Sequence, residues 1–237
     1  MRKENIHDMK KYLIVIVSVL MIGVYGCTMK PNNVPEQNYH ETEYEVVGEA
    51  KEYLTDKYGS FYYEVLGFFE AGWNHEYDLL NLAVEIDGQK ESFSVQRHKT
   101  ESGYIFQDNY FGLLIRPSFE EKVSALAKDY FEEYKVYATL TQNYPDNLTD
   151  ATQIDDLLAL DNLQNISVVV TVKDISGDME KFESTAAAFV DQWSKEEIPS
   201  TVRVICLSCE VFENISRSNV SSVYVENQLA EYRKILK

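Results

Sequence analysis

The spacing of apolar residues changes twice along the chain after residue 42, and this alternation restricts the fold class most strongly. Apolar residues recur at helical spacing over 43–58, whereas 61–107 contain aromatic and β-branched runs that partly alternate like strands. Helical spacing returns after Pro117, which we expect to open a helix that reaches Tyr134. The order helix, strands, helix predicts an α+β fold in which helices pack on one face of an antiparallel sheet.

Four strands are expected in this first half of the chain. They cover 61–69, 77–86, 91–97 and, as a shorter strand, 102–107. Asp87-Gly88 stands between the second and third of them, and this dipeptide favours the two-residue turn of a β-hairpin. We therefore expect an antiparallel meander inside an α+β domain of residues 43–140.

A smaller second subdomain is expected over residues 141–237. Its candidate boundary is 141–151, which contains Pro145 and several turn formers. The strand, helix, strand order of the segments that follow resembles half of a split βαβ arrangement. An edge strand at 136–140 closes the first domain, and the elements expected after the boundary are a short helix at 152–160, a strand at 166–172, a helix at 178–194, a long strand at 201–212, a strand at 219–225 and a helix at 226–237.

The first 27 residues combine a basic start, an apolar run and an early cysteine. The apolar run, 12–25, has 14 residues. As a helix it would be about 21 Å long, shorter than the roughly 30 Å hydrocarbon core of a bilayer. This length is typical of the apolar region of a signal peptide. The positive charges that precede it are Arg2, Lys3, Lys10 and Lys11.

Val24-Tyr25-Gly26-Cys27 resembles a lipobox, the motif of bacterial lipoprotein precursors in which an aliphatic, a variable and a small residue precede a cysteine. The resemblance implies that 1–26 form a signal peptide and that a diacylglycerol is attached to the Cys27 thiol. Two acyl chains hold a protein stably on a bilayer. The expected location is therefore the cell membrane, with the protein facing the extracytoplasmic side.

Residues 27–42 would then hold the lipidated cysteine and a flexible tether, because the segment is rich in Pro and Asn and lacks apolar periodicity. Two alternatives for the N-terminal residues remain open, namely an ordinary cleaved signal peptide and a short signal anchor.

The chain is strongly acidic. It has 22 Lys and Arg against 39 Asp and Glu, which gives a net charge of −17. Residues 1–26 hold four basic and two acidic side chains, so the chain from Cys27 onward carries −19. Such a surface repels phosphate backbones, and we therefore expect no nucleic acid among its partners.

The pair Cys206 and Cys209 has the C-x-x-C spacing of thiol redox sites. Within the expected strand 201–212, however, the two side chains face opposite sides with Cα atoms about 10 Å apart, beyond the ~7 Å limit for a disulfide. We interpret them as two separate cysteines in preference to a redox or metal site. No zinc, haem or phosphate-loop motif is present, so no metal and no cofactor is expected.

The densest polar and aromatic cluster of the mature chain lies in the loop between the first two expected strands. Loops on a rigid sheet are common places for binding residues, and 108–110 lie in a later loop that could approach this one. The alternative is a hairpin loop in which Trp73 plugs the end of the sheet and the charges are solvated. The candidate residues are Trp73, His75, Glu76 and Asp78, with His98 from a later loop.

These features favour a non-catalytic interaction or binding module of the cell envelope, whose partner is an unknown envelope protein or ligand. One alternative is a surface hydrolase or glycan-modifying enzyme using Glu76, Asp78 and His98, which needs a histidine within hydrogen-bond reach of a carboxylate in a cleft. Another is a ligand-binding lipoprotein of a transporter, which needs a pocket between two lobes hinged near Pro145.

Replacing Cys27 by Ser tests the lipid anchor. We expect Cys27→Ser to abolish metabolic labelling with palmitate and to release the protein from the membrane fraction, because the acylated thiol is lost. Cys209→Ser is the matched control and keeps the label. An unlabelled parent protein, or a Cys27→Ser variant that still partitions with membranes, contradicts the lipoprotein interpretation.

Overall fold

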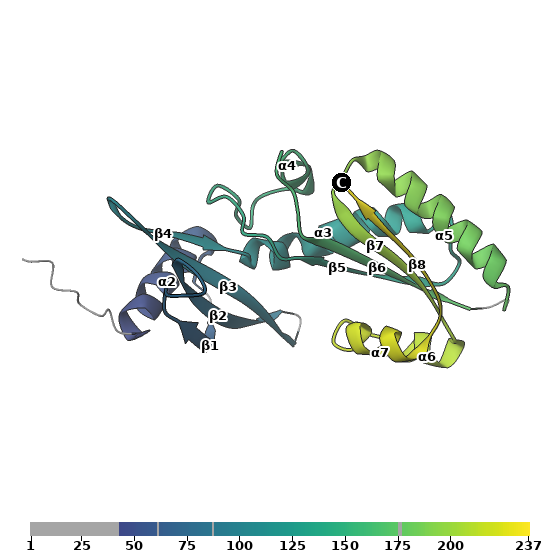
Figure 1. Ribbon diagram of the computed structural model, residues 1–237, viewed down its shortest axis with the longest axis horizontal. Coiled ribbons are helices and arrows are strands. Elements are labelled where there is room, and N and C mark those ends of the chain that lie inside the picture. The colour runs from purple at the N-terminus through teal and green to yellow at the C-terminus, as the bar shows by residue number, and fades with distance from the viewer. Residues whose placement is uncertain (1–42, 61, 87, 175–176) are drawn as a thin grey trace, which may run out of the picture. The chain divides into compact units, whose positions relative to one another are not determined.

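The computed structural model describes residues 43–60, 62–86, 88–174 and 177–237. The predicted signal peptide, Cys27 and the tether therefore lie outside the described residues. Residues 41–237 belong to one unit, and its described part is an α+β fold with two four-stranded sheets (Figure 1). None of the helices in these ranges is long and apolar enough to cross a membrane.

The first sheet has the strand order β1-β2-β3-β4 and is antiparallel throughout, which confirms the predicted meander. Ile86 pairs with Gln89, so two residues connect β2 to β3 as the hairpin prediction required. Helix α2 confirms the first predicted helix and buries Leu54 in the core. The bounds are α2 Glu43–Tyr58, β1 Glu64–Phe69, β2 Tyr77–Ile86, β3 Gln89–Thr100 and β4 Gly103–Asp108.

The second sheet has the order β5-β6-β7-β8. Strands β6 and β7 are parallel and joined through α5, which confirms a βαβ unit, but they are direct neighbours and the unit is therefore not split. The other two pairings are antiparallel. The bounds are β5 Tyr134–Leu140, α4 Ile154–Leu158, β6 Ile166–Lys173, α5 Met179–Trp193, η1 Ser194–Glu196, β7 Ser200–Leu207, α6 Cys209–Asn214, α7 Val220–Asn227 and β8 Gln228–Leu236.

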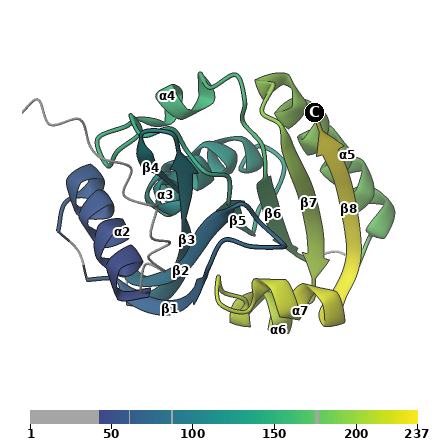
Figure 2. The same ribbon diagram turned by 60° about the vertical axis from the view of Figure 1, so that its left-hand side comes forward.

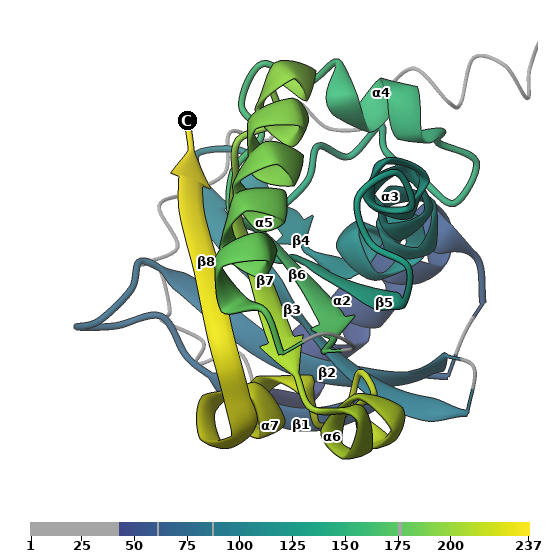
Figure 3. The same cartoon turned by 90° about the vertical axis from the view of Figure 1, so that its right-hand side faces the viewer.

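Helices lie on both faces of the second sheet. Val202 and Val204 of β7 belong to the main core, into which α5 packs, whereas Ile205 and Leu207 belong to a smaller apolar cluster with residues of α6 and α7. Because successive strand residues face opposite sides, α5 and the pair α6 and α7 cover opposite faces (Figures 1 and 3). On the second face, Thr201 and Arg203 border a cleft.

Helix α3 (Tyr110–Ala127) connects the two sheets, following β4 in the chain and packing against β5 (Figure 2). One apolar cluster includes Leu82 of β2, Phe119 of α3 and Val170 of β6, so the buried core is continuous across both predicted halves. The sheets divide at α3, before the expected boundary at 141–151, because β5 pairs with β6.

The predicted start of α3 at Pro117 is wrong, because the helix begins at Tyr110 and contains Pro117 inside it. The first turns bury Tyr110, Phe111 and Ile115 in the core. This burial outweighs the backbone hydrogen bond that the proline removes. The carbonyl that lacks its helical partner belongs to Leu113, which is only partly buried.

Three expectations for the C-terminal part are also wrong. The predicted strand 201–212 ends at Leu207, because the Ser208 hydroxyl accepts a hydrogen bond from the Val211 N–H and caps α6. Residues 219–225 fall mainly in helix α7 instead of a strand. Residues 228–236 form strand β8 instead of a helix, because pairing along β7 overrides the helical propensity of their Leu, Ala, Glu, Arg and Lys.

The packing of α3 on β5 predicts opposite effects for two glycine substitutions. A Cβ at Gly112 would overlap the backbone carbonyl of Leu140, whereas a Cβ at Gly48 in α2 would meet nothing within 4 Å. We expect Gly112→Ala to lower the free energy of unfolding by about 1–3 kcal/mol. Gly48→Ala, the control, should raise it by roughly 0.5–1 kcal/mol. Urea unfolding measures both, and equal effects would contradict this packing.

Candidate functional site

The loop between β1 and β2 lies next to strand β3. The ring of His75 stacks on Tyr77 with centroids 4.9 Å apart, and the Tyr77 ring lies 4.9 Å from that of His98. His98 itself belongs to strand β3, where a loop was expected. Trp73 is 102% exposed, so it does not plug the end of the sheet, and Glu76 is exposed as well.

Asp78 has a structural role. Its side chain is buried and accepts hydrogen bonds from Arg97 Nε at 2.8 Å and from the Ala71 N–H at 2.8 Å. Arg97 also forms an ion pair with Glu49 of α2, with Nη1 and Oε2 2.8 Å apart. Asp78 therefore helps to hold α2 on the first sheet, and its oxygens are occupied.

The two histidines bind neutral groups. His75 Nδ1 lies 2.5 Å from the carbonyl oxygen of Tyr77, and His98 Nε2 lies 3.2 Å from Gln96 Oε1. Among the residues that the structure describes, no hydrogen bond or ion pair joins either histidine to a carboxylate. The structure thus brings His75 and His98 to one patch of the sheet without the acid/base pair that the hydrolase alternative needs.

The two cysteines lie in different elements. Cys206 is buried at the end of β7, whereas Cys209 is exposed at the first position of α6. Burial raises the pKa of the Cys206 thiol to about 11, so this thiol stays protonated at neutral pH. Both are free cysteines, and they do not lie in one strand as the prediction assumed, because β7 ends at Leu207. Within the described ranges, no group of three or more metal-ligating side chains is found.

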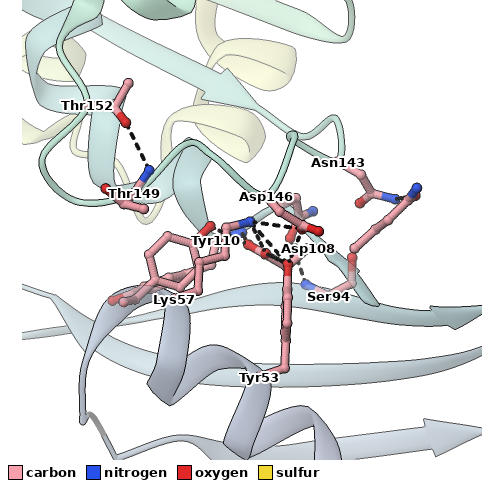
Figure 4. A network of polar contacts seen from close by, with 12 residues as sticks. Tyr53, Lys57, Ser94, Asp108, Tyr110, Asn143, Asp146, Thr149 and Thr152 are labelled. Carbon is pink, nitrogen blue, oxygen red and sulfur yellow. Dashed lines mark hydrogen bonds and ion pairs between the residues drawn. The ribbon is translucent and has the colours of Figure 1, made fainter. Parts of the chain in front are cut away.

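A buried polar network surrounds Asp108 at the end of β4 (Figure 4). The Asp108 carboxylate, which is 0% exposed, accepts hydrogen bonds from the Tyr53 hydroxyl at 2.7 Å, Lys57 Nζ at 2.8 Å, the Tyr58 hydroxyl at 2.9 Å and the Tyr110 N–H at 2.9 Å. Burial and the charge of Asp108 raise the pKa of Tyr53 and Tyr58, so both hydroxyls remain protonated donors.

This network fixes the chain at the start of α3. Asn109, the next residue, accepts a hydrogen bond from the Ser94 N–H at 2.7 Å, and the Asp108 carbonyl accepts one from the Tyr144 N–H at 3.0 Å. Because α2, β3, β4 and the 141–148 segment are held together here, the first turn of α3 has a defined position. Asn109 and Gly112 also border the cleft that Thr201 and Arg203 of β7 line.

The cleft has a volume of about 680 Å³. Its walls come from β3, the first turns of α3, the face of the second sheet on which α6 and α7 pack, α7 itself, and residues of the connecting segments. Most of the side chains that line it are polar, and several carry hydroxyl or amide groups. These are Ser92, Asn109, Thr139, Thr141, Asn165, Ser167, Thr201 and Ser221.

Arginine is concentrated in this cleft. The chain contains only six arginines, and four of them line it, with Glu91 as the single carboxylate in the lining. In a protein of net charge −17, this is a local reversal of sign. The four are Arg116, Arg203, Arg217 and Arg233.

Two of these arginines are neutralised by glutamates. Arg116 Nη2 lies 2.8 Å from Glu91 Oε1, and Arg217 forms a short ion pair with Glu120 of α3. Arg203 has a longer contact, 3.4 Å from Nε to Glu231 Oε1. In the described part of the chain, Arg233 is exposed and has no ion pair. Among the four arginines of the cleft, Arg233 of β8 is therefore the one whose charge no ion pair balances in the described part of the chain.

No sequence pattern indicates this site, because its arginines are scattered along the chain with no common spacing. The one available signal was the rarity of arginine in so acidic a chain. A comparison with known protein families finds no matching family model, and no curated protein matches the sequence.

The role of Asp78 predicts a contrast between two neighbouring carboxylates. Asp78→Asn leaves the buried Arg97 without its main partner, and we expect it to lower the free energy of unfolding by about 3 kcal/mol. Glu76→Gln, at an exposed position, should change it by less than about 0.5 kcal/mol. Chemical denaturation measures both values. If Asp78→Asn leaves the free energy of unfolding unchanged, the structural role is contradicted and Asp78 is again a candidate ligand-binding residue.

Proposed function

We propose that the protein is a lipid-anchored binding module of the cell envelope and that the arginine-lined cleft is its ligand site. One observation carries the proposal: four of the chain's six arginines line a single cleft of about 680 Å³ in a protein of net charge −17. Arginines that served only solubility or surface ion pairs would be dispersed over the surface.

The setting of the cleft supports binding. Most of its lining residues belong to strands and helices, which hold their polar groups in place, whereas connecting segments supply Asn109, Thr141, Asn165 and Arg217. Thr139 and Arg233 are exposed, which leaves the cleft open to a ligand from solvent. A volume of about 680 Å³ lies inside the range of roughly 300–1,000 Å³ that is usual for small-molecule sites.

The anchor rests on the lipobox resemblance at Cys27, which would place the module on the extracytoplasmic side of the cell membrane. The proposal contains no catalytic step, since the oxygens of Asp78 are occupied by Arg97 and Ala71 and the histidines bind neutral groups. The partner in the envelope is a ligand or a protein that presents one.

A ligand-binding lipoprotein of a transporter is the second candidate. It is favoured by the position of the cleft, which is bordered by β3 of the first sheet and by β5, β6 and β7 of the second. The two candidates differ in what happens after binding, because a transporter component must release its ligand to a membrane protein.

Photo-crosslinking on intact cells tests the ligand site. A photoreactive amino acid at Thr139, which is exposed and lines the cleft, should give a discrete adduct with an envelope component. The same amino acid at Glu183, exposed on α5, is the control and should not give that adduct. Identical adducts at both positions, or none at Thr139, would contradict the proposal.

A further inference from the structure

We infer that the ligand of the cleft carries an oxyanion, a phosphate or a carboxylate, which binds between the guanidinium groups of Arg203 and Arg233. This inference rests on the proposed binding function and names the chemical class of the ligand. It follows from strand register, from the pairing of nearby charges, and from the polar lining of the cleft.

The register places two positive charges opposite each other. Arg203 of β7 and Arg233 of β8 are direct partners in an antiparallel pair, and both line the cleft, so they lie on the same face of the sheet. Directly opposite residues have Cβ atoms about 4.5–5.5 Å apart, and like charges in such a pair are destabilising. An anion bound between them would convert this repulsion into two attractions.

The neighbouring lysine shows how this strand neutralises a positive charge elsewhere. Lys234, the next residue of β8, forms an ion pair with Asp191 of α5, with Nζ and Oδ1 2.7 Å apart. In the described ranges, no corresponding carboxylate is paired with Arg233, whereas Arg203 forms an ion pair with Glu231, with Nε and Oε1 3.4 Å apart. The two guanidinium groups therefore lie beside one paired carboxylate, and the positive charge of Arg233 is left without an ion-pair partner in the described residues.

Guanidinium groups suit an oxyanion better than ammonium groups do. Each presents a planar fork of N–H donors that can bind two oxygens of a phosphate or carboxylate at once. Every basic residue in the lining is arginine and none is lysine. This composition is expected for recognition of an oxyanion with defined geometry.

The uncharged polar residues of the cleft indicate the chemical character of the rest of the ligand. Hydroxyl and amide groups such as those of Ser167, Thr201 and Asn165 can donate and accept hydrogen bonds, which matches a body that carries hydroxyl groups. The ligand class is thus a hydroxylated compound with one oxyanion, such as a polyol phosphate or a sugar acid. The acidic surface outside the cleft repels a bilayer of anionic lipids, so a free or polymer-borne group is favoured over a headgroup.

Calorimetric titration of the full-length protein in detergent tests the inference. The probes are inorganic phosphate, glucuronate, and glucose as an uncharged hydroxylated compound. We expect at least one anion to bind about tenfold or more tightly than glucose, with affinity that falls as salt rises. Binding of phosphate alone identifies a phosphate ligand, and binding of glucuronate alone identifies a carboxylate.

Three substitutions complete the test. Arg203→Gln and Arg233→Gln should each weaken anion binding by about tenfold or more, whereas Lys234→Gln, which removes the same charge from the adjacent residue, should change it by less than about twofold. Without ligand, Arg233→Gln should raise the Tm because it removes the cross-strand repulsion. A purely structural arginine would give a lower Tm instead.

The outcomes separate this inference from the proposed function. If neither anion binds, or if both arginine variants bind as the parent does, the oxyanion assignment is overturned. If a specific adduct nevertheless forms at Thr139, the proposed binding function is retained and the ligand belongs to another chemical class. If the adduct is also missing, both proposals fall.

Discussion

The arrangement of the two sheets depends on one buried charge, the carboxylate of Asp108. A carboxylate with no solvent exposure is costly unless it is paired and hydrogen-bonded. Lys57 and two tyrosine hydroxyls from α2 satisfy it, together with the first N–H of α3. Because these donors come from two different helices, few placements of α2 and α3 on β4 satisfy the carboxylate. Helix α3 then packs on β5, so the position of the second sheet follows from the same constraint.

The cleft combines this rigid geometry with an unusual distribution of charge. Asn109 and the first turns of α3 form part of its wall, and their position is set by the Asp108 network. The acidic exterior and the arginine-rich interior have opposite effects on anions. The long-range field repels them, whereas the local field between Arg203 and Arg233 attracts them at close range. Such a combination favours selective capture of an oxyanion over general adhesion to anionic surfaces.

Local sequence patterns predicted the elements whose amphipathic period agrees with their final burial. Helix α2 and strands β2, β3 and β6 belong to this class, since one face or the whole segment is buried as its pattern indicates. The failures share a different cause. Burial of Tyr110 and Phe111 extends α3 past the proline that was expected to open it, and pairing with β7 makes a strand of a segment with helical composition. In both cases a distant partner outweighs local propensity.

The amino-acid sequence by itself determined the α+β class, the βαβ-like order of the second half and the acidic character. Tertiary structure alone decided which charged groups meet. In the folded protein, the candidate binding residue Asp78 forms an ion pair with Arg97. Four arginines that are far apart in the chain line one cleft. The physical reason is that periodicity specifies only which face a residue occupies. Strand pairing and helix packing across more than a hundred residues specify what lies opposite it.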